Sequence, residues 1–381
     1  MTVERILPTP EAYDLLDLVR EIADRELAPR AADFEARAEF PREPLRILAR
    51  AGLFGLPYDE EYGGGGQPYE VYLQVLEEIA ARWLTAAEAI SVHTLSCFPV
   101  AAYGTDAQRK RFLPELLGGG KLGAYCLSEP AGGSDAGAMT TRAVRDGDDY
   151  VVTGTKAWIT HAHHADVYNV FCRTGGPGPQ GISCLLADAG TPGIVPQAPE
   201  RTMALRASPV AQIAFDGARV PAGRLVGEEG AGFRIAMSAL DSGRLGIAAC
   251  AVGLAQAALD YAVAYARERE QFGSPVIRFQ GVGFLLADMA TAVSVARAQT
   301  LWAARLKDAG RPFSMAAAQA KLFATDTAMR VTTDAVQVLG GYGYVADHPV
   351  ERYMREAKVL QIVEGTNQIQ RLVIARYLER G

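Results

Sequence analysis

The chain has 381 residues, of which 49% are hydrophobic and 22% charged, and its formal net charge is −6. This length exceeds what one hydrophobic core supports and predicts about two or three domains. The acidic balance argues against a nucleic acid or an anionic membrane as a partner. The five cysteines are scattered without a CxxC pair, which favours reduced thiols in a reducing compartment over a disulfide framework or a zinc site.

The N-terminus carries acidic residues and lacks a basic stretch followed by an apolar one, so we expect the first helix of the fold there and not a signal peptide. The richest apolar segment, Leu245–Ala266, contains Asp260 and lies between Arg244 and Arg267. Because a membrane span needs about eighteen uncharged apolar residues, this segment predicts a buried bundle helix. We therefore expect a soluble, cytoplasmic protein without membrane contacts.

Helical periodicity dominates the chain from about Thr9 to Leu117. Pro41 and the glycine runs at 63–66 and 118–120 interrupt it as helix breakers. The sequence predicts an N-terminal helical domain over residues 1–121. Apolar residues recur at spacings of three and four at Leu15, Leu16, Val19, Ile22 and Ala23, and again at Tyr72, Val75, Leu76 and Ile79.

Short β-branched and aromatic runs follow, and proline and glycine bound most of them, as a small antiparallel barrel or sandwich requires. Asp146-Gly147 lies between two such segments and predicts a hairpin turn. We predict a middle antiparallel β-barrel domain over residues 122–227. The runs are Tyr150–Thr153, Val167–Phe171, Gly181–Asp188 and Val210–Phe215.

The remaining residues, 228–381, predict a C-terminal four-helix bundle because long helical segments alternate with short connectors. The fold class is therefore an α+β multidomain protein. Glycine-rich segments at 227–232 and 340–343 miss the G-x-G-x-x-G spacing and join no strand to a helix, so they predict turns and not a dinucleotide fingerprint. The helical segments are Gly243–Glu270, Gln280–Asp308, Ser314–Leu339 and Pro349–Leu378.

Three segments could contact a polar ligand. Residues 124–135 combine small and hydroxyl-bearing side chains that suit either a ligand contact or a surface turn. Trp158 and Thr160 point to the same strand face, and they could serve one ring system or form a half-buried surface. Residues 267–273, with Gln280 beyond them, place Arg and Gln at a helix end. That pattern suits a pyrophosphate and an adenine edge, or a solvated helix terminus.

Glu364 is the candidate general base. Apolar residues precede it, and the nearest basic residues are Lys358 and Arg371. Desolvation without a close partner would raise the pKa of its carboxyl, as proton abstraction near neutral pH requires. The same segment also fits a helix break, in which Gly365 ends one helix and Thr366 or Asn367 caps the next; the two interpretations are compatible.

Histidines at 161, 163 and 164 raise the question of a metal site. His163 and His164 are adjacent and would point to opposite faces of a strand. No cysteine or carboxylate cluster joins them in the sequence. We therefore expect no metal.

In this order and at these distances, the segments resemble the acyl-CoA dehydrogenases along nearly the whole chain, and the short-chain (butyryl-CoA) branch most of all. Six motifs in register make the resemblance specific. They are SEPAGGSDAGAM from 128, GTKAWIT from 154, ALDSGRLGIAA from 239, REREQFG from 267 with FQ at 279, QVLGGYGY from 337 and VEGTNQIQRL from 363.

The resemblance implies a fold of N-terminal helices, central β-barrel and C-terminal four-helix bundle that encloses FAD, in a homotetramer built as a dimer of dimers. It implies that one group of residues binds the flavin and pyrophosphate within a subunit, and that another reaches in from a neighbouring subunit. The first group is Tyr125, Leu127, Ser128, Gly133, Ser134, Trp158, Thr160, Arg269, Gln271, Gln280, Thr366 and Gln368, and the second is Gln337, Gly340 and Gly341.

The same resemblance implies α,β-desaturation of a short- or medium-chain acyl-CoA to the trans-2-enoyl-CoA. Glu364 takes the α-proton, hydride leaves Cβ for the flavin, and electrons pass to an electron-transfer flavoprotein. Some branches place the base on the helix that holds residues 241–244, but Ser242 and Gly243 cannot do that here. The residues implied in substrate binding are Ser134, Asp241, Arg244 and Gly365.

Two departures from the family pattern fall in the middle domain: His161 replaces a common Asn, and the Met203–Val210 run is altered. They bear on substrate contacts or a partner surface more than on the chemistry. Two alternatives stay open, an acyl-CoA oxidase that uses O2 and a non-catalytic scaffold that binds flavin or CoA. Acyl chain length and branching are also open.

Overall fold

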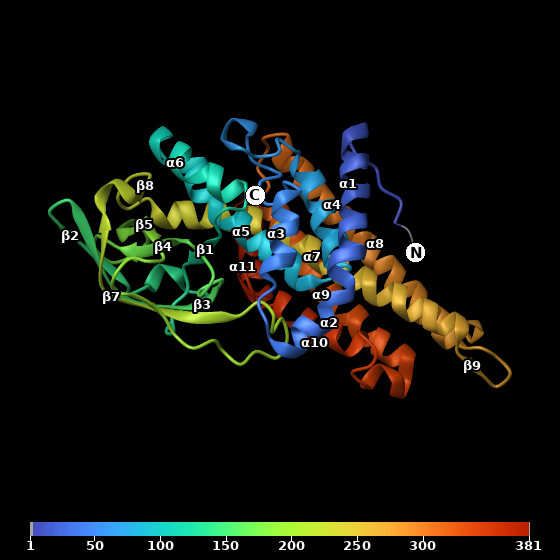
Figure 1. Ribbon diagram of the computed structural model, residues 1–381. Coiled ribbons are helices and arrows are strands. Elements are labelled where there is room, and N and C mark those ends of the chain that lie inside the picture. Colours follow the sequence, from blue (N-terminus) through green and yellow to red (C-terminus); the bar gives the residue numbers. More distant parts are fainter. Residues whose placement is uncertain (1–2, 381) are drawn as a thin grey trace.

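The computed structural model describes residues 3–380. Its chain runs from helices through a sheet and back to helices (Figure 1). The strands lie at one end of the molecule, and a small hairpin between two long helices lies at the opposite end (Figure 1). This arrangement determines which predicted site residues can meet within one chain.

The N-terminal helices form as the sequence pattern predicts. Thr9 caps the first of them by accepting a hydrogen bond from the backbone of Ala12, and Thr105 and Gln108 form a capping box at the sixth. Helices α4 and α5 are buried along almost their whole length and pack against each other and against α7. The helices are α1 Pro10–Ile22, α2 Ala28–Arg37, α3 Arg42–Arg50, α4 Tyr69–Ala80, α5 Leu84–Tyr103 and α6 Asp106–Leu117.

The middle region is one mostly antiparallel sheet, in the order β6-β7-β3-β2-β4-β5-β8, with β1 parallel to β4. The predicted turn at Asp146-Gly147 is confirmed, since it joins the antiparallel pair β2–β3 and Gly147 has a φ of 60°. The strands are β1 Gly123–Cys126, β2 Arg142–Asp146, β3 Asp149–Thr160, β4 Val167–Arg173, β5 Ile182–Asp188, β6 Ile194–Pro196, β7 Val210–Pro221 and β8 Leu225–Val226.

The predicted barrel is wrong, because the sheet does not close. Its outer strands are too short to continue the ladder: β6 has three residues and ends at Pro196, which lacks an N–H, and β8 has two. Helices α5 and α7 pack against β1, β4 and β5. They bury apolar surface of the sheet that closure would otherwise cover.

The C-terminal helices differ from expectation at two places. Helix α7 begins at Gly232 and not at Gly243, and the expected fourth helix is divided into α10 and α11 around Glu364. Helix α7 contacts α4, α5, α8 and α9, so it is the central helix of the molecule. The elements are α7 Gly232–Glu268, the hairpin β9 Glu270–Gln271 and β10 Ser274–Pro275, α8 Gln280–Asp308, α9 Ser314–Leu339, α10 Val350–Leu360 and α11 Asn367–Glu379.

Three helices, α5, α7 and α8, are long and apolar enough to cross a membrane by length and composition alone. The most apolar 18-residue stretches of α5 and α7 are 89% and 78% buried inside the protein, as the bundle prediction requires for α7. Only 28% of the corresponding stretch of α8 is buried. Helix α8 therefore presents an apolar face to the outside, with Phe284, Val295 and Trp302 exposed.

Candidate active site

Glu364 lies in a tight left-handed link between two helices. Helix α10 ends at Leu360, and Thr366 caps α11 by accepting a hydrogen bond from the backbone N–H of Ile369. The predicted helix break is therefore confirmed. Glu364 has a φ of 52° and Gly365 a φ of 89°. For a residue with a side chain this conformation costs about 1–2 kcal/mol, so the surroundings must hold it in place.

The Glu364 carboxyl is buried, and neither oxygen has a hydrogen-bond partner among the described residues. Burial raises its pKa to about 8; the nearby Glu88 adds to this rise, whereas Lys321 and Arg244 oppose it. A Cβ added at Gly243 would lie 2.1 Å from the Oε2 atom of Glu364. The carboxyl therefore rests against α7 at a position where only glycine leaves it room.

A pocket of about 230 Å³ opens beside this carboxyl. Gly243 belongs to its wall, so Glu364 stands directly behind the pocket lining. The hydroxyls of Ser91, Thr94 and Ser242 are buried there without a partner in the described part of the chain. The other lining residues are Pro57, Tyr58, Tyr69, Leu95, Phe98, Ala101, Ala102, Ala239 and Lys307.

Asp241 and Arg244, both expected to bind substrate, form an ion pair of 2.6 Å one turn apart on α7. Ser314 at the start of α9 donates a hydrogen bond to Asp241. Arg244 is buried, and its charge acts on the Glu364 carboxyl. The structure thus places this pair beside Glu364.

Trp158 and Thr160 occupy the end of β3. Trp158 is 62% exposed and has a φ of 60°, within an irregular stretch of the β3–β7 ladder. The Thr160 hydroxyl donates a long hydrogen bond of 3.4 Å to Glu88, and the hydroxyl of Ser208 donates one of 2.8 Å to the same carboxyl. The exposed Trp158 ring lies two residues from this hydroxyl, and a ligand contact of the two side chains stays a prediction.

Glu88 is a residue that the sequence interpretation missed. It is buried on α5, and desolvation raises its pKa to about 7, against the opposing hydrogen bonds from Ser208 and Thr160. The available signal was a single acid within the apolar run Leu84–Tyr103. A carboxyl buried in such a helix has to be explained by function or by partners.

The turn after β1 carries several predicted cofactor contacts. Ser128 accepts a hydrogen bond from the backbone of Ala157, which brings the turn beside Trp158. A buried ion pair of 2.9 Å between Lys156 and Glu129 fixes the turn to β3. The Tyr125 hydroxyl donates to the carbonyl of Ala236 on α7, Leu127 is buried, and Gly133 and Ser134 are exposed.

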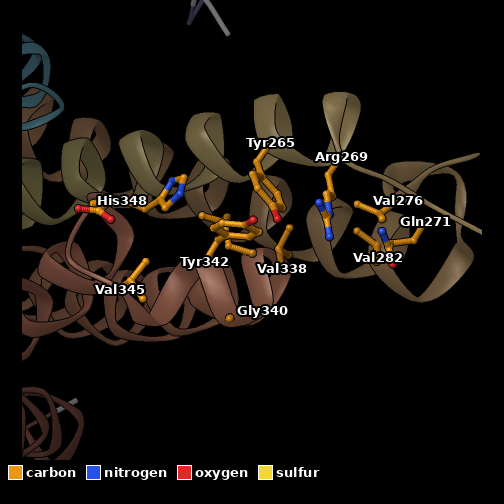
Figure 2. A pocket seen from close by; sticks show the side chains of 13 residues that line it. Tyr265, Arg269, Gln271, Val276, Val282, Val338, Gly340, Tyr342, Val345 and His348 are labelled. Atoms are coloured by element: carbon orange, nitrogen blue, oxygen red, sulfur yellow. The ribbon is translucent and has the colours of Figure 1, made fainter.

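A second pocket, of about 720 Å³, lies at the β9 end of the molecule (Figure 2). Tyr265 and Arg269 project from α7 toward Tyr342, and the Arg269 guanidinium lies 5.6 Å from the centre of the Tyr342 ring (Figure 2). The other lining residues are Gln271, Val276, Val282, Val338, Leu339, Gly340, Gly341, Val345, Asp347 and His348.

This pocket brings Arg269, Gln271, Gly340 and Gly341 together within one chain. Gln280 and Gln337 are exposed next to the lining residues Val282 and Val338 but are not part of the lining. No residue of this pocket belongs to the pocket at Gly243. Within the described residues, the predicted cofactor contacts therefore form two separate groups. Gln368, on the first turn of α11, is exposed.

The three histidines do not converge on one point. His161 is buried with a φ of 65° and lies 3.2 Å from the Gly123 carbonyl, and burial lowers its pKa to about 3. His164 stacks on Phe40 at 3.9 Å. Across residues 3–380, no group of three or more His, Cys, Asp or Glu side chains could hold a metal ion.

The altered Met203–Val210 run is tied to three helices. The backbone of Ala207 donates to Glu35 on α2, Ser208 donates to Glu88 on α5, and Arg355 on α10 donates to the Met203 carbonyl. Ser208 is a residue that the family pattern retains, so its contact with Glu88 does not depend on the departures, which are at Met203, Ala204 and Val210.

Helices, a sheet and further helices, with a buried carboxyl that has no hydrogen-bond partner among the described residues close to a small pocket, have the arrangement of a multidomain enzyme. Three models of acyl-CoA dehydrogenase match it: the N-terminal domain at residues 9–120, the middle domain at 124–218 and the C-terminal domain at 230–379. The chain belongs to the acyl-CoA dehydrogenase family.

Individual relatives agree. The short-chain specific acyl-CoA dehydrogenase of Clostridium acetobutylicum is 42% identical over 369 residues, covering 96% of this chain and 97% of its own. The structure of butyryl-CoA dehydrogenase from Megasphaera elsdenii is 40% identical with a TM-score of 0.96, over 99% of this chain and all of its own. One chain of a solved structure that concerns the electron transferring flavoprotein of Acidaminococcus fermentans is 41% identical to this chain, with a TM-score of 0.97. The match covers 99% of this chain and all of that one.

Proposed function

We propose that this acyl-CoA dehydrogenase uses FAD to desaturate a short- or medium-chain acyl-CoA, straight or branched, to the trans-2-enoyl-CoA. The observation that carries the proposal is the buried Glu364 carboxyl at the wall of the pocket, with no hydrogen-bond partner among the described residues. Its raised pKa makes it a stronger base than a solvated carboxylate. Glu364 removes the α-proton of the acyl group in a site from which water is largely excluded.

The residues around Trp158 fit a flavin ring. An exposed indole offers a stacking surface, the Thr160 hydroxyl lies two residues further along the strand, and the exposed Gly133 and Ser134 leave access for phosphate groups. Tyr125, Leu127 and Ser128 would hold the ring edge, and Thr366 and Gln368 would contact it from α11. Bound FAD supplies the acceptor for the hydride that leaves Cβ.

Activation of the α-hydrogen falls to this chain as well. The family resemblance assigns the backbone N–H of Glu364 to the thioester carbonyl, where a hydrogen bond stabilises the developing negative charge. Asp241, Arg244, Ser134 and Gly365 are the proposed contacts to the acyl-CoA. The pocket volume of about 230 Å³ lies below the usual range for drug-sized ligands and favours a short acyl chain.

The second pocket supports a homotetramer built as a dimer of dimers. Arg269, Gln271, Gly340 and Gly341 form a cationic, glycine-lined cavity that suits the ADP part of FAD, with Gln280 and Gln337 beside it. Strand β9, whose Gln271 lines this cavity, lies at the opposite end of the molecule from the sheet (Figure 1). A second subunit can bring its own cavity to the Trp158 region, and the exposed apolar face of α8 supplies contact surface.

We propose an electron-transfer flavoprotein as the acceptor, in keeping with the structural neighbour from Acidaminococcus fermentans. A cytoplasmic location is part of the same proposal, supported by five buried cysteines without a disulfide. Cell fractionation followed by immunoblotting tests the location. Reduction of purified electron-transfer flavoprotein under anaerobic conditions tests the acceptor.

Anaerobic titration of the holoenzyme with a panel of acyl-CoAs tests the central proposal. Bleaching of the flavin band by one member, together with formation of its enoyl-CoA, is the expected result. Bound flavin that no acyl-CoA reduces would favour a scaffold. Stoichiometric peroxide during aerobic turnover would favour an oxidase, and failure to bind FAD after reconstitution would overturn the proposal.

A further inference from the structure

Lys321 on α9 is fully buried next to the link that carries Glu364. Its Nζ donates a hydrogen bond of 3.0 Å to the carbonyl of Gly365 and one of 2.9 Å to the side chain of Asn367. Asn367 is itself held by Thr325 and Asp326. The ammonium therefore contacts both the left-handed turn and the first residue of α11.

Two donors from different helices share the Gly365 carbonyl. Gln370 on α11 donates to it at 2.7 Å, and Lys321 donates at 3.0 Å. The two side chains provide the same kind of hydrogen bond, but only Lys321 brings a positive charge. A buried lysine is more difficult to desolvate than an amide, so a purely structural need would be met by a second neutral donor.

Lys321 is one of several titratable groups that act on Glu364 from the surrounding elements. Among them Lys321 and Arg244 stabilise the ionised carboxylate, whereas Glu88 disfavours it. Burial lowers the pKa of Lys321 and raises that of Glu364, and the charge of each group opposes the shift of the other. The Glu364 charge in turn raises the pKa of neighbouring groups that are neutral when protonated, namely Tyr69 and Tyr72 on α4, Tyr125 on β1 and Cys250 on α7.

We propose that Lys321 is a positioning residue for Glu364: it holds the strained turn through the Gly365 carbonyl and keeps positive charge beside the carboxylate. The inference rests on the proposed function of Glu364 as the base. The turn aims the carboxylate at the pocket, and the charge keeps enough of it ionised to remove a proton. A base with neither support would be misdirected and protonated over a wider pH range.

The test compares Lys321→Gln, which removes the charge and keeps an N–H donor on a side chain one bond shorter, with Gln370→Met, which loses a donor and no charge. Infrared difference spectra of each holoenzyme follow the C=O stretch of protonated Glu364, identified by its loss in Glu364→Gln. Lys321→Gln should move the pH midpoint of this band upward by about 1 pH unit or more. Gln370→Met should leave the midpoint unchanged, and Lys321→Arg should restore it.

The pH midpoint of flavin reduction should shift in the same direction as the pH midpoint of the infrared band. An unchanged midpoint in Lys321→Gln, or an equal shift in Gln370→Met, would overturn the inference and leave Lys321 a structural residue. Lys321→Met provides a second loss of charge if the glutamine variant does not retain FAD. The infrared measurement needs no turnover. If no acyl-CoA reduces the flavin, the proposed function is refuted, and the infrared spectra still decide the role of Lys321.

Discussion

The carboxyl of Glu364 and the α-carbon of Gly243 are in contact across the interface between α7 and the α10–α11 link. A single methyl group at position 243 would lie 2.1 Å from Oε2. Two segments more than a hundred residues apart in sequence thus meet here, and of the two residues Gly243 lines the pocket. Gly243 leaves the space that the base occupies.

Replacing Gly243 by Ala should displace the carboxyl and leave the fold intact, since the clash is with the end of a side chain. We expect flavin reduction to slow by about 100-fold or more, because small misplacements of a catalytic group have effects of this size. Stopped-flow reduction measures it. Stability should fall by about 1–3 kcal/mol in urea unfolding.

Gly281→Ala on α8 is the matched control for stability, because a Cβ there meets nothing within 4 Å. It should stabilise the helix by about 0.5–1 kcal/mol. Normal reduction kinetics in Gly243→Ala would show that the carboxyl is free to move without loss of function.

Glu364→Gln should retain FAD and lose acyl-CoA reduction by a factor of about 100 to 10,000, the usual range for a general base. Its thermal stability should equal or exceed that of the parent, because the variant no longer buries an ionisable carboxyl. Absorbance of the bound flavin and differential scanning calorimetry check both points. Retained turnover would refute the assignment of the base.

Flavin reduction should accelerate as the pH rises through about 8, because Glu364 must lose its proton to act and burial holds its pKa there. Glu88 raises this pKa further. Glu88→Gln removes that negative charge, so the acidic limb of the rate profile should move to lower pH. A limb that stays in place would mean that Glu88 does not affect the base.

The raised pKa of Glu364 also affects stability. A carboxyl with a higher pKa in the folded state stabilises the fold below its unfolded value near 4.3, and this contribution is lost as the pH rises through about 8. Glu364→Gln should therefore lose less stability than the parent between pH 5 and 9. Urea midpoints at both pH values measure the difference, and parallel losses in the two proteins would contradict the expectation.

Arg269→Met should weaken FAD retention by about tenfold or more, because a charge-assisted hydrogen bond to phosphate contributes about 1.5–3 kcal/mol. The fluorescence of flavin released when the holoenzyme is diluted measures FAD retention. Arg267→Met is the control, since Arg267 is exposed two residues away and does not line the pocket. Equal release from both variants would place the cofactor elsewhere.

Local patterns predicted the parts of the fold that depend on neighbours in sequence. The apolar spacing at Tyr72 to Ile79 gave α4, and Asp146-Gly147 gave the β2–β3 turn. Glu364 stood out because its sequence neighbours are apolar. Contacts over long separations were not predictable: Lys321 meets Gly365 across 44 residues, and Glu88 meets Thr160 across 72.

Sheet closure and helix limits failed for similar reasons. Whether a sheet closes depends on whether its outer strands meet, and the sequence pattern did not show that β6 and β8 have only three and two residues. Helix α7 continues N-terminally from Gly243 to Gly232 because α4, α5 and the sheet pack around it, which overrides the low helix propensity of glycine.

The Arg269 pocket shares no lining residue with the pocket beside Glu364, and this separation has a genetic consequence under the proposed assembly. Each active site would combine Glu364 of one subunit with Arg269 of another. Two alleles, one altered at Glu364 and one at Arg269, would each encode an inactive homotetramer. Expressed together, they would form mixed particles in which one pairing is intact, so the two defective genes would complement each other.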